Sequence, residues 1–213
     1  MRFVPPSREV LAEVLLAAGP QAPTLCTGWQ VRHLAAHLVL REHHPLAAGI
    51  GLDALRPRME RLLARWSDAA AEPEGLARLV SRFRRGPSRL HPLRVPALDH
   101  AANLVEYFVH TEDVRRASDR WAPRVLDTEY SEELWRALVR SSALLYRGVD
   151  VGIILVRPDG QRHVVRKAAT SVAITGEPQE LLMHAHGRRG HALVTFEGSP
   201  DAVALLSSAE LGS

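Results

Sequence analysis

The chain has 213 residues, 46% of them hydrophobic, which is enough to bury the core of one large domain or of two modest ones. No apolar run is long enough to span a bilayer, and Pro5 and Pro6 stand where a signal peptide would need an apolar segment. The single cysteine, Cys26, excludes an internal disulfide and fits a reducing compartment. We therefore expect a cytoplasmic protein that does not bind membranes.

The positive charge of the chain does not predict a nucleic-acid partner. The sequence pI is near 9.6, but the net charge is only +3, and arginines are interspersed with acidic residues throughout. The densest basic cluster is broken by Gly86 and Pro87 and contains no interleaved aromatic residue for base stacking. We interpret this cluster as a solvated loop; its members are Arg82, Arg84, Arg85 and Arg89.

The first two thirds of the sequence are predicted to be helical. Residues 5–18 carry apolar side chains at i, i+3 and i+4 and are stopped by Gly19. A second helix should begin near Trp29, after the capping-box spacing of Thr27 and Gln30, and end in the mid-forties. Further helices are expected over residues 55–66, 76–83, 97–118 and 131–146, the last of them capped by Ser131.

After Gly148 the apolar pattern changes from a helical period to strict alternation. This pattern predicts the order β-β-β-α-β-α, with a hairpin first and a Ser199 cap before the last helix. The expected strands are residues 151–157, 161–167, 170–175 and 191–198, and the expected helices are 177–186 and 202–206. We therefore predict an α+β fold, with a helical domain over residues 1–148 and a small second domain over residues 149–213.

The long helix over residues 97–118 carries one polar stripe on an otherwise apolar surface. Members of the stripe recur at spacings of four and three, which places them on one face: Asp99, Asn103, Glu106, His110 and Asp113. Carboxylates and imidazoles persist in a protein interior only when they are paired or metal-bound. Glu106 and His110 lie one turn apart, so both side chains can converge on a single ion.

A second apolar helix has a matching stripe, composed of Gln30, His33, His37, Arg41 and His44. Two such helices predict a metal ion held between them by two imidazoles and one carboxylate, with one coordination position open. The spacing does not choose among His33, His37 and His44 as the ligand from the second helix. It also leaves open the alternative that these histidines are satisfied polar residues or ion-pair partners.

The segments CTGWQVRHLAAHL, residues 26–38, and NLVEYFVHTEDVRRA, residues 103–117, resemble two signature stretches of an actinobacterial metal-binding family. That family is related to the mycothiol-dependent maleylpyruvate isomerases, within the DinB-like superfamily. The resemblance extends to LW at 134–135, VG at 151–152 and ITGEPQELLMHAHGR at 174–188. It implies a DinB-like four-helix bundle followed by a sterol-carrier-like α/β domain.

Carried over by position, the resemblance implies that His37, Glu106 and His110 bind the metal, most simply zinc. His33 departs from the family pattern, where an acidic residue is expected, and is either an additional ligand or a neighbour of the ligands. Further candidates for the surroundings of the ion or for a substrate pocket are Asn103, Asp113 and Arg115. Without an identified base beside it, Cys26 is interpreted as a packed thiol rather than a nucleophile.

The family relationship implies a transferase or isomerase in which the metal activates the thiol of mycothiol toward an electrophilic small molecule. Two alternatives stay open from the sequence. One is a non-catalytic metal-binding protein, whose site would be fully ligated and closed. The other is a hydrolase that uses a metal-bound water. A solvent-reachable ligand position favours either enzyme over the structural site.

Overall fold

The structure, a computed structural model, describes residues 2–43, 56–86 and 96–212, with the backbone alone for residues 96–102. The chain divides into two compact units, Met1–Pro123 and Arg124–Ser213. Its described residues form eight α-helices and one four-stranded sheet, which confirms the predicted mixture of helices with a small sheet. None of the helices in these ranges is both long and apolar enough to cross a membrane.

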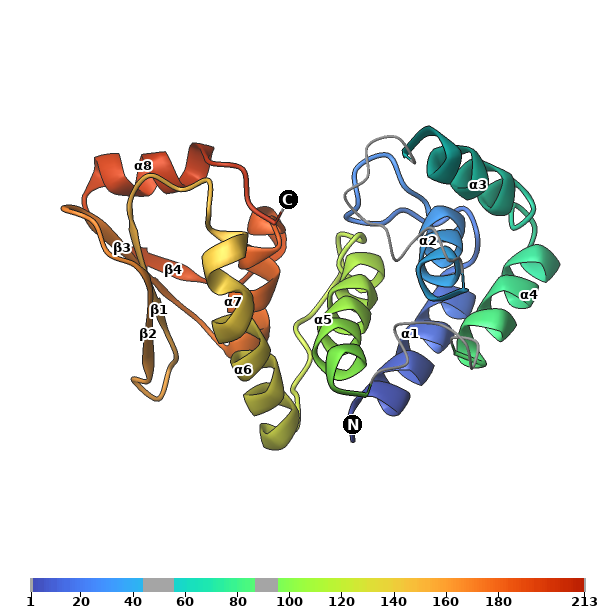
Figure 1. Cartoon of the computed structure of the whole chain (residues 1–213), viewed down its shortest axis with the longest axis horizontal. Helices are drawn as coiled ribbons and strands as arrows, with labels where there is room; N and C mark the ends of the chain where they lie inside the picture. The colour runs from blue at the N-terminus through green and yellow to red at the C-terminus, as the bar shows by residue number, and fades with distance from the viewer. Residues whose placement is uncertain (1, 44–55, 87–95, 213) are drawn as a thin grey trace. The chain divides into compact units, whose positions relative to one another are not determined.

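The first unit is helical, as the periodicity predicts (Figure 1). Its helices are α1 (Val4–Ala18), α2 (Val31–His43), α3 (Arg56–Asp68), α4 (Pro73–Arg84) and α5 (Pro96–Arg115). The predicted stop after α1 is present, because Gly19 adopts a positive φ of 82° that few other residues tolerate. The expected loop of arginines is different: Arg82 and Arg84 belong to the last turn of α4, and Arg89 lies outside the described residues.

Helix α1 packs against α4 and α5, and α2 packs against α3 and α4. The buried core between them is apolar, and its largest members include Leu11, Leu15, Leu34, Leu38, Leu76, Phe83 and Tyr107. Burial of these side chains, at about 1.5–3 kcal/mol for each large one, is the main force that holds the helices together. The polar stripes of α2 and α5 face each other at one side of this core.

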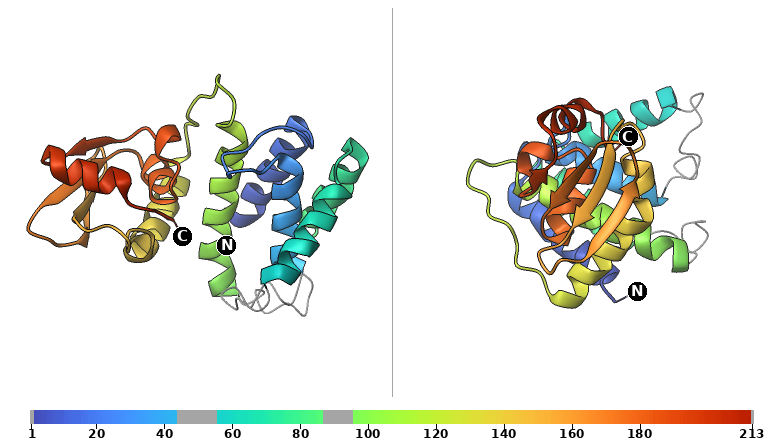
Figure 2. Two further views of the ribbon diagram at one scale, coloured as in Figure 1. Left: turned by 90° about the horizontal axis from the view of Figure 1, so that it is seen from above. Right: turned by 90° about the vertical axis from the view of Figure 1, so that its left-hand side faces the viewer.

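The second unit is built on a sheet with the strand order β2-β1-β3-β4 (Figures 1 and 2). The strands are β1 (Gly152–Val156), β2 (Arg162–Arg166), β3 (Ser171–Thr175) and β4 (Thr195–Glu197). The predicted hairpin is present: β1 pairs with β2 in antiparallel fashion, around a turn that contains Gly160 at a φ of 86°. β1 pairs with β3 in parallel, and β3 pairs with β4 antiparallel.

The helices of the second unit are α6 (Thr128–Leu145), α7 (Pro178–Ala185) and α8 (Pro200–Ser208). The cap of α6 is Asp127, whose side chain accepts hydrogen bonds from the backbone of Glu129 and Tyr130, and not the expected Ser131. The cap of α8 is Ser199, as predicted. The last strand is shorter than predicted: a short 3₁₀ helix ends at His191, and residues 192–194 have no regular structure before β4 begins.

Helix α6 lies in a different unit from the one to which the sequence assigned it. The predicted boundary near residue 148 made α6 the last helix of the first domain. In the structure α6 packs against α7 and β2, and the division between the units falls between Pro123 and Arg124. The apolar side of α6, which includes the buried Trp135 and Leu138, therefore completes the core of the sheet unit.

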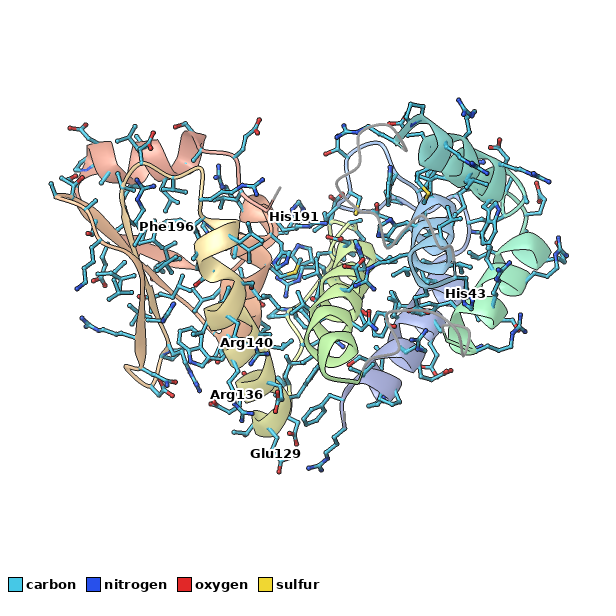
Figure 3. The ribbon with its side chains drawn as sticks, viewed as in Figure 1. His43, Glu129, Arg136, Arg140, His191 and Phe196 are labelled. Carbon is cyan, nitrogen blue, oxygen red and sulfur yellow. The ribbon has the colours of Figure 1, made fainter. Side chains whose placement is uncertain are left out.

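A buried polar pair lies within the second unit. The Tyr146 hydroxyl and His184 Nδ1 are 2.9 Å apart, both residues are almost fully buried, and the ring of Phe196 (labelled in Figure 3) contacts His184 at 5.4 Å between centroids. Burial, with a smaller contribution from the charge of Arg189, lowers the pKa of His184 from 6.5 to about 4. The folded protein therefore holds this imidazole in its neutral form at pH 7.

This pair predicts a loss of stability in mild acid. Because the pKa of His184 is lower in the folded chain than in the unfolded chain, the unfolded state takes up a proton first as pH falls from 6.5 to about 4. The free energy of unfolding should fall through this window by roughly 3 kcal/mol in total, at about 1.4 kcal/mol per pH unit. Urea titrations at several pH values should show a clearly shallower decline for His184→Gln. Equal declines for the wild-type protein and His184→Gln would show that His184 does not cause this loss of stability.

Candidate metal centre

Three of the predicted site residues meet between α2 and α5. His37 projects from α2, and Glu106 and His110 project from successive turns of α5. Glu106 Oε1 lies 3.1 Å from His37 Nε2 and also 3.1 Å from His110 Nε2. One ligand atom from each of the three side chains lies within 4.8 Å of the other two. The geometry therefore brings together the three residues that the family resemblance selected.

Two of the three donor–donor separations are close to those of a tetrahedral ion. With zinc–nitrogen and zinc–oxygen distances near 2.0–2.1 Å, neighbouring donor atoms of a tetrahedral site are about 3.3 Å apart. The two 3.1 Å separations at Glu106 Oε1 need little change to reach this value. The three side chains are also partly accessible, at 35% for His37, 23% for Glu106 and 12% for His110. Solvent therefore reaches the cluster, and three protein ligands would leave one position of a tetrahedral ion for a further ligand.

The electrostatics of the cluster favour an ionised carboxylate. Burial opposes the ionisation of Glu106, but hydrogen bonds from His110 and His37 outweigh it and hold the pKa of this carboxyl well below its usual range. Burial likewise opposes a charge on His110, and the hydrogen bonds with Asp113, Cys26 and Glu106 outweigh it and raise the pKa of His110. The cluster thus favours positive charge next to Glu106. A bound cation would supply this charge in place of a proton on a histidine.

Asp113 orients the His110 ring through Nδ1, the nitrogen opposite the candidate ligand atom Nε2. Its side chain is fully buried, and Oδ2 lies 2.8 Å from His110 Nδ1. An ionised carboxylate can only accept, so Nδ1 carries the proton and Nε2 is left with its lone pair directed at the candidate ion. The backbone oxygen of Asp113 also accepts a hydrogen bond from Leu25, which ties the loop before α2 to α5.

Cys26 lies beside this orienting pair, which the sequence did not predict. Its Sγ is 3.3 Å from Asp113 Oδ2 and 4.0 Å from His110 Nδ1. Cys26, His110 and Asp113 are therefore a second group with the ligand types of a metal site. The two groups use opposite nitrogens of His110. The Nε2 side is the better candidate for an ion, because Asp113 Oδ2 already accepts from Nδ1, and His37 and Glu106 on the Nε2 side are more exposed than Asp113.

Arg41 is a further member of the site, although the sequence placed it on the stripe of α2 without a role. Its guanidinium donates to Asn103 Oδ1 at 2.5 Å, and its Nε lies 3.6 Å from Glu106 Oε1. The Arg41 charge contributes to the low pKa of Glu106. Asn103 thus lies beside the cluster, where it accepts a hydrogen bond from Arg41.

Two other candidates lie elsewhere. His33 Nδ1 accepts the backbone N–H of Gln30 at 3.1 Å, so this side chain caps the start of α2 and belongs to neither ligand group found among the described residues. Arg115 donates to Glu112 and to the carbonyl oxygen of Ala122, so it does not reach the cluster as a carboxylate clamp. His44 and the side chain of Asp99 lie outside the described residues.

Fold and site together define a two-unit α+β protein with a candidate three-ligand metal centre in its helical unit. The fold is similar to that of mycothiol-dependent maleylpyruvate isomerase in two crystal structures. One, of a histidine-to-alanine mutant, gives a TM-score of 0.62 at 18% identity, and covers 91% of this chain and 90% of that chain. The other gives a TM-score of 0.60 at 19% identity with the same coverage. No protein-family model and no curated protein matches the sequence.

Proposed function

We propose that the protein is a divalent-metal enzyme, most simply a zinc enzyme, that uses mycothiol or a similar small thiol in a transferase or isomerase reaction on an electrophilic small molecule. The observation that carries the proposal is the convergence of His37, Glu106 and His110 on one point with an accessible side. The fold likeness to mycothiol-dependent isomerases supports the choice of a thiol. An enzyme that uses a free thiol needs a reducing compartment, and we assign it to the cytoplasm.

The ligand types support this metal and this class of reaction. Two imidazoles and one carboxylate suit zinc, and three protein ligands are typical of catalytic rather than structural sites. A bound divalent ion would favour the thiolate form of a thiol at neutral pH, and the thiolate is the nucleophile. We also propose that the two units correspond to the DinB-like bundle and the sterol-carrier-like domain of the isomerases.

The residues of this chain have distinct roles in the proposed reaction. His37, Glu106 and His110 hold the ion, and Asp113 keeps His110 in the tautomer that presents Nε2. Asn103 accepts a hydrogen bond from Arg41 and so orients its guanidinium, which places a fixed positive charge 3.6 Å from Glu106 Oε1. This charge favours an anionic thiolate or a substrate carboxylate in the accessible part of the site.

Mycothiol should stabilise the metal-loaded protein against heat. At a concentration of 100 times its Kd, a ligand that binds only the folded state adds about 2.7 kcal/mol, and for a chain of this size that raises Tm by roughly 5–10 °C. A thermal-shift titration measures the effect, with the metal-free protein and the disulfide form of mycothiol as controls. Calorimetry in two buffers should show about one proton released for each thiol bound.

The controls separate this proposal from its alternatives. The metal-free protein should show no shift with mycothiol, because the coordinating ion is missing. If metal is bound and no thiol stabilises the protein at millimolar concentration, the thiol-dependent reaction is wrong. A metal-water hydrolase or a non-catalytic metal protein then explains the site better.

A further inference from the structure

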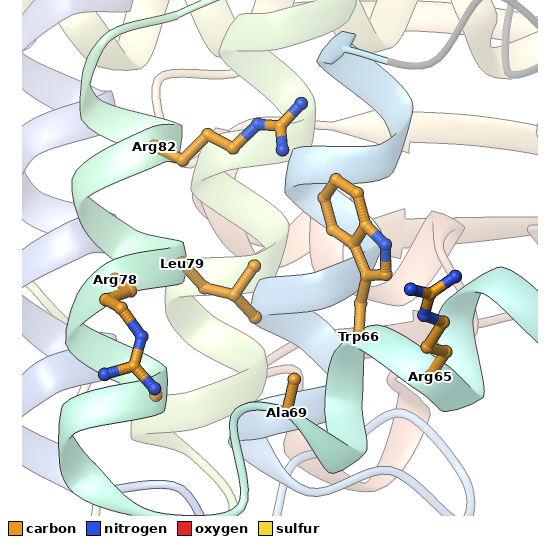
Figure 4. Close-up of a pocket in the computed structure, with 7 residues that line it drawn as sticks. Arg65, Trp66, Ala69, Arg78, Leu79 and Arg82 are labelled. Atoms are coloured by element: carbon orange, nitrogen blue, oxygen red, sulfur yellow. The ribbon is translucent and has the colours of Figure 1, made fainter.

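A pocket of about 440 Å³ lies between α3 and α4, and none of its lining residues is a candidate metal ligand (Figure 4). Its lining consists of Arg65, Trp66, Ala69, Gly75, Arg78, Leu79 and Arg82. A Cβ on Gly75 would lie 2.2 Å from the carbonyl oxygen of Ala69, so a glycine is needed where α4 approaches the turn after α3. The volume is within the range of small-molecule sites.

The pocket has positive charge without matching negative charge. Among the described residues, no carboxylate pairs with Arg65, Arg78 or Arg82, although Glu74 stands one turn before Arg78. Arg78 and Arg82 are four residues apart on one helix, a spacing at which like charges repel, and Figure 4 shows their guanidinium groups directed apart. An anion near these arginines would offset the repulsion between their charges.

The pocket also offers an aromatic surface. Trp66 is partly exposed, and the Arg82 guanidinium lies 4.7 Å from the centre of its ring. Figure 4 shows Arg82 directed toward the Trp66 ring and Arg65 beside the same ring. Leu79 and Ala69 add an apolar wall. The lining therefore suits a ligand with anionic groups on a compact carbon skeleton, since arginine binds carboxylate and phosphate through paired N–H donors.

We propose that this pocket binds a small organic anion with two or more carboxylate or phosphate groups, whose skeleton lies against Trp66 and Leu79. The anionic groups are held by Arg65, Arg78 and Arg82. The candidate metal ligands lie on α2 and α5, whereas this pocket is lined by α3, α4 and the turn between them. The pocket is therefore a second small-molecule site, separate from the metal site of the proposed reaction.

The test follows the indole N–H signal of Trp66 in the full-length, ¹⁵N-labelled protein. The chain has four tryptophans, and Trp66→Phe assigns the signal by its disappearance. Glutarate is the dicarboxylate probe and fructose 1,6-bisphosphate is the phosphate probe, each compared with sodium chloride at equal ionic strength. A saturable shift of the Trp66 signal with one or both probes is expected, and the comparison identifies the preferred anionic group.

Matched arginine variants establish where the anion binds. Arg78→Gln and Arg65→Gln should each weaken binding by about fivefold or more, as expected when one charge-assisted contact is lost. Arg140→Gln removes the same charge from an exposed position on α6 (labelled in Figure 3) and should change the affinity by less than about twofold. The proposal is overturned if neither probe gives a saturable shift, or if Arg140→Gln weakens binding as much as Arg78→Gln.

Discussion

Alanine in place of His37, Glu106 or His110 is expected to leave the purified protein without stoichiometric metal, whereas the wild-type protein is expected to carry about one divalent ion per chain. Each substitution removes one of the three proposed ligands, whose donor atoms lie within 4.8 Å of each other. Loss of a residue that merely supports a ligand costs about 10–100-fold in metal affinity, so loss of a ligand itself should cost more than about 100-fold. Elemental analysis and competition with a chromophoric chelator measure both quantities.

Three further variants locate the ion. His33→Ala removes a histidine of the same helix that caps α2, and it should keep the full stoichiometry. Asp113→Asn should keep the ion but bind it about 10–100-fold more weakly, because His110 loses its orienting acceptor. Cys26→Ser should also keep the ion. If Cys26→Ser loses the metal and His37→Ala retains it, the ion is bound by the group of Cys26, His110 and Asp113 instead.

The sequence predicted most helices and strands because their periods are local and strong. The stop at Gly19, the hairpin turn at Gly160 and the cap at Ser199 are each set by one residue with a defined backbone role. The partner of α6 was not predictable in the same way. An apolar stripe shows that a helix buries one side, but a bundle and a sheet can both cover that side. For this reason the expected boundary at residue 148 differs from the observed division after Pro123.

The candidate metal ligands differ in how far the sequence could identify them. Glu106 and His110 follow from the geometry of a single helix, since side chains four residues apart lie one turn over each other. His37 lies on another helix, and spacing alone did not separate it from His33. In the structure His33 instead accepts a hydrogen bond from the backbone of Gln30 at the start of α2. Cys26 was missed because it reaches the site from a loop, through contacts with residues more than eighty positions away.

A buried charged network joins the helices that carry the site. Arg8 of α1 donates to Glu42 of α2 at 2.5 Å and to the backbone oxygen of Phe83 at 2.7 Å. The Tyr107 hydroxyl of α5 donates to the other carboxylate oxygen of Glu42. Burial raises the pKa of the Glu42 carboxyl, and the charge of Arg8 offsets part of that effect. Glu42 is only 1% exposed, so the network has little access to solvent.

Glu42→Ala is therefore expected to destabilise the helical unit by about 3–5 kcal/mol, because the Tyr107 hydroxyl loses its buried acceptor and the largely buried Arg8 cation loses its counter-charge and keeps only the Phe83 oxygen. Glu9→Ala is the matched control. It breaks another glutamate–arginine pair of 2.5 Å, with Arg84, but both partners are more than a third exposed, so the cost should stay below about 1 kcal/mol. Urea unfolding followed by circular dichroism, in the presence of a chelator, separates these costs from metal binding. If both variants lose the same free energy of unfolding, burial does not determine how much the Glu42–Arg8 pair contributes to stability.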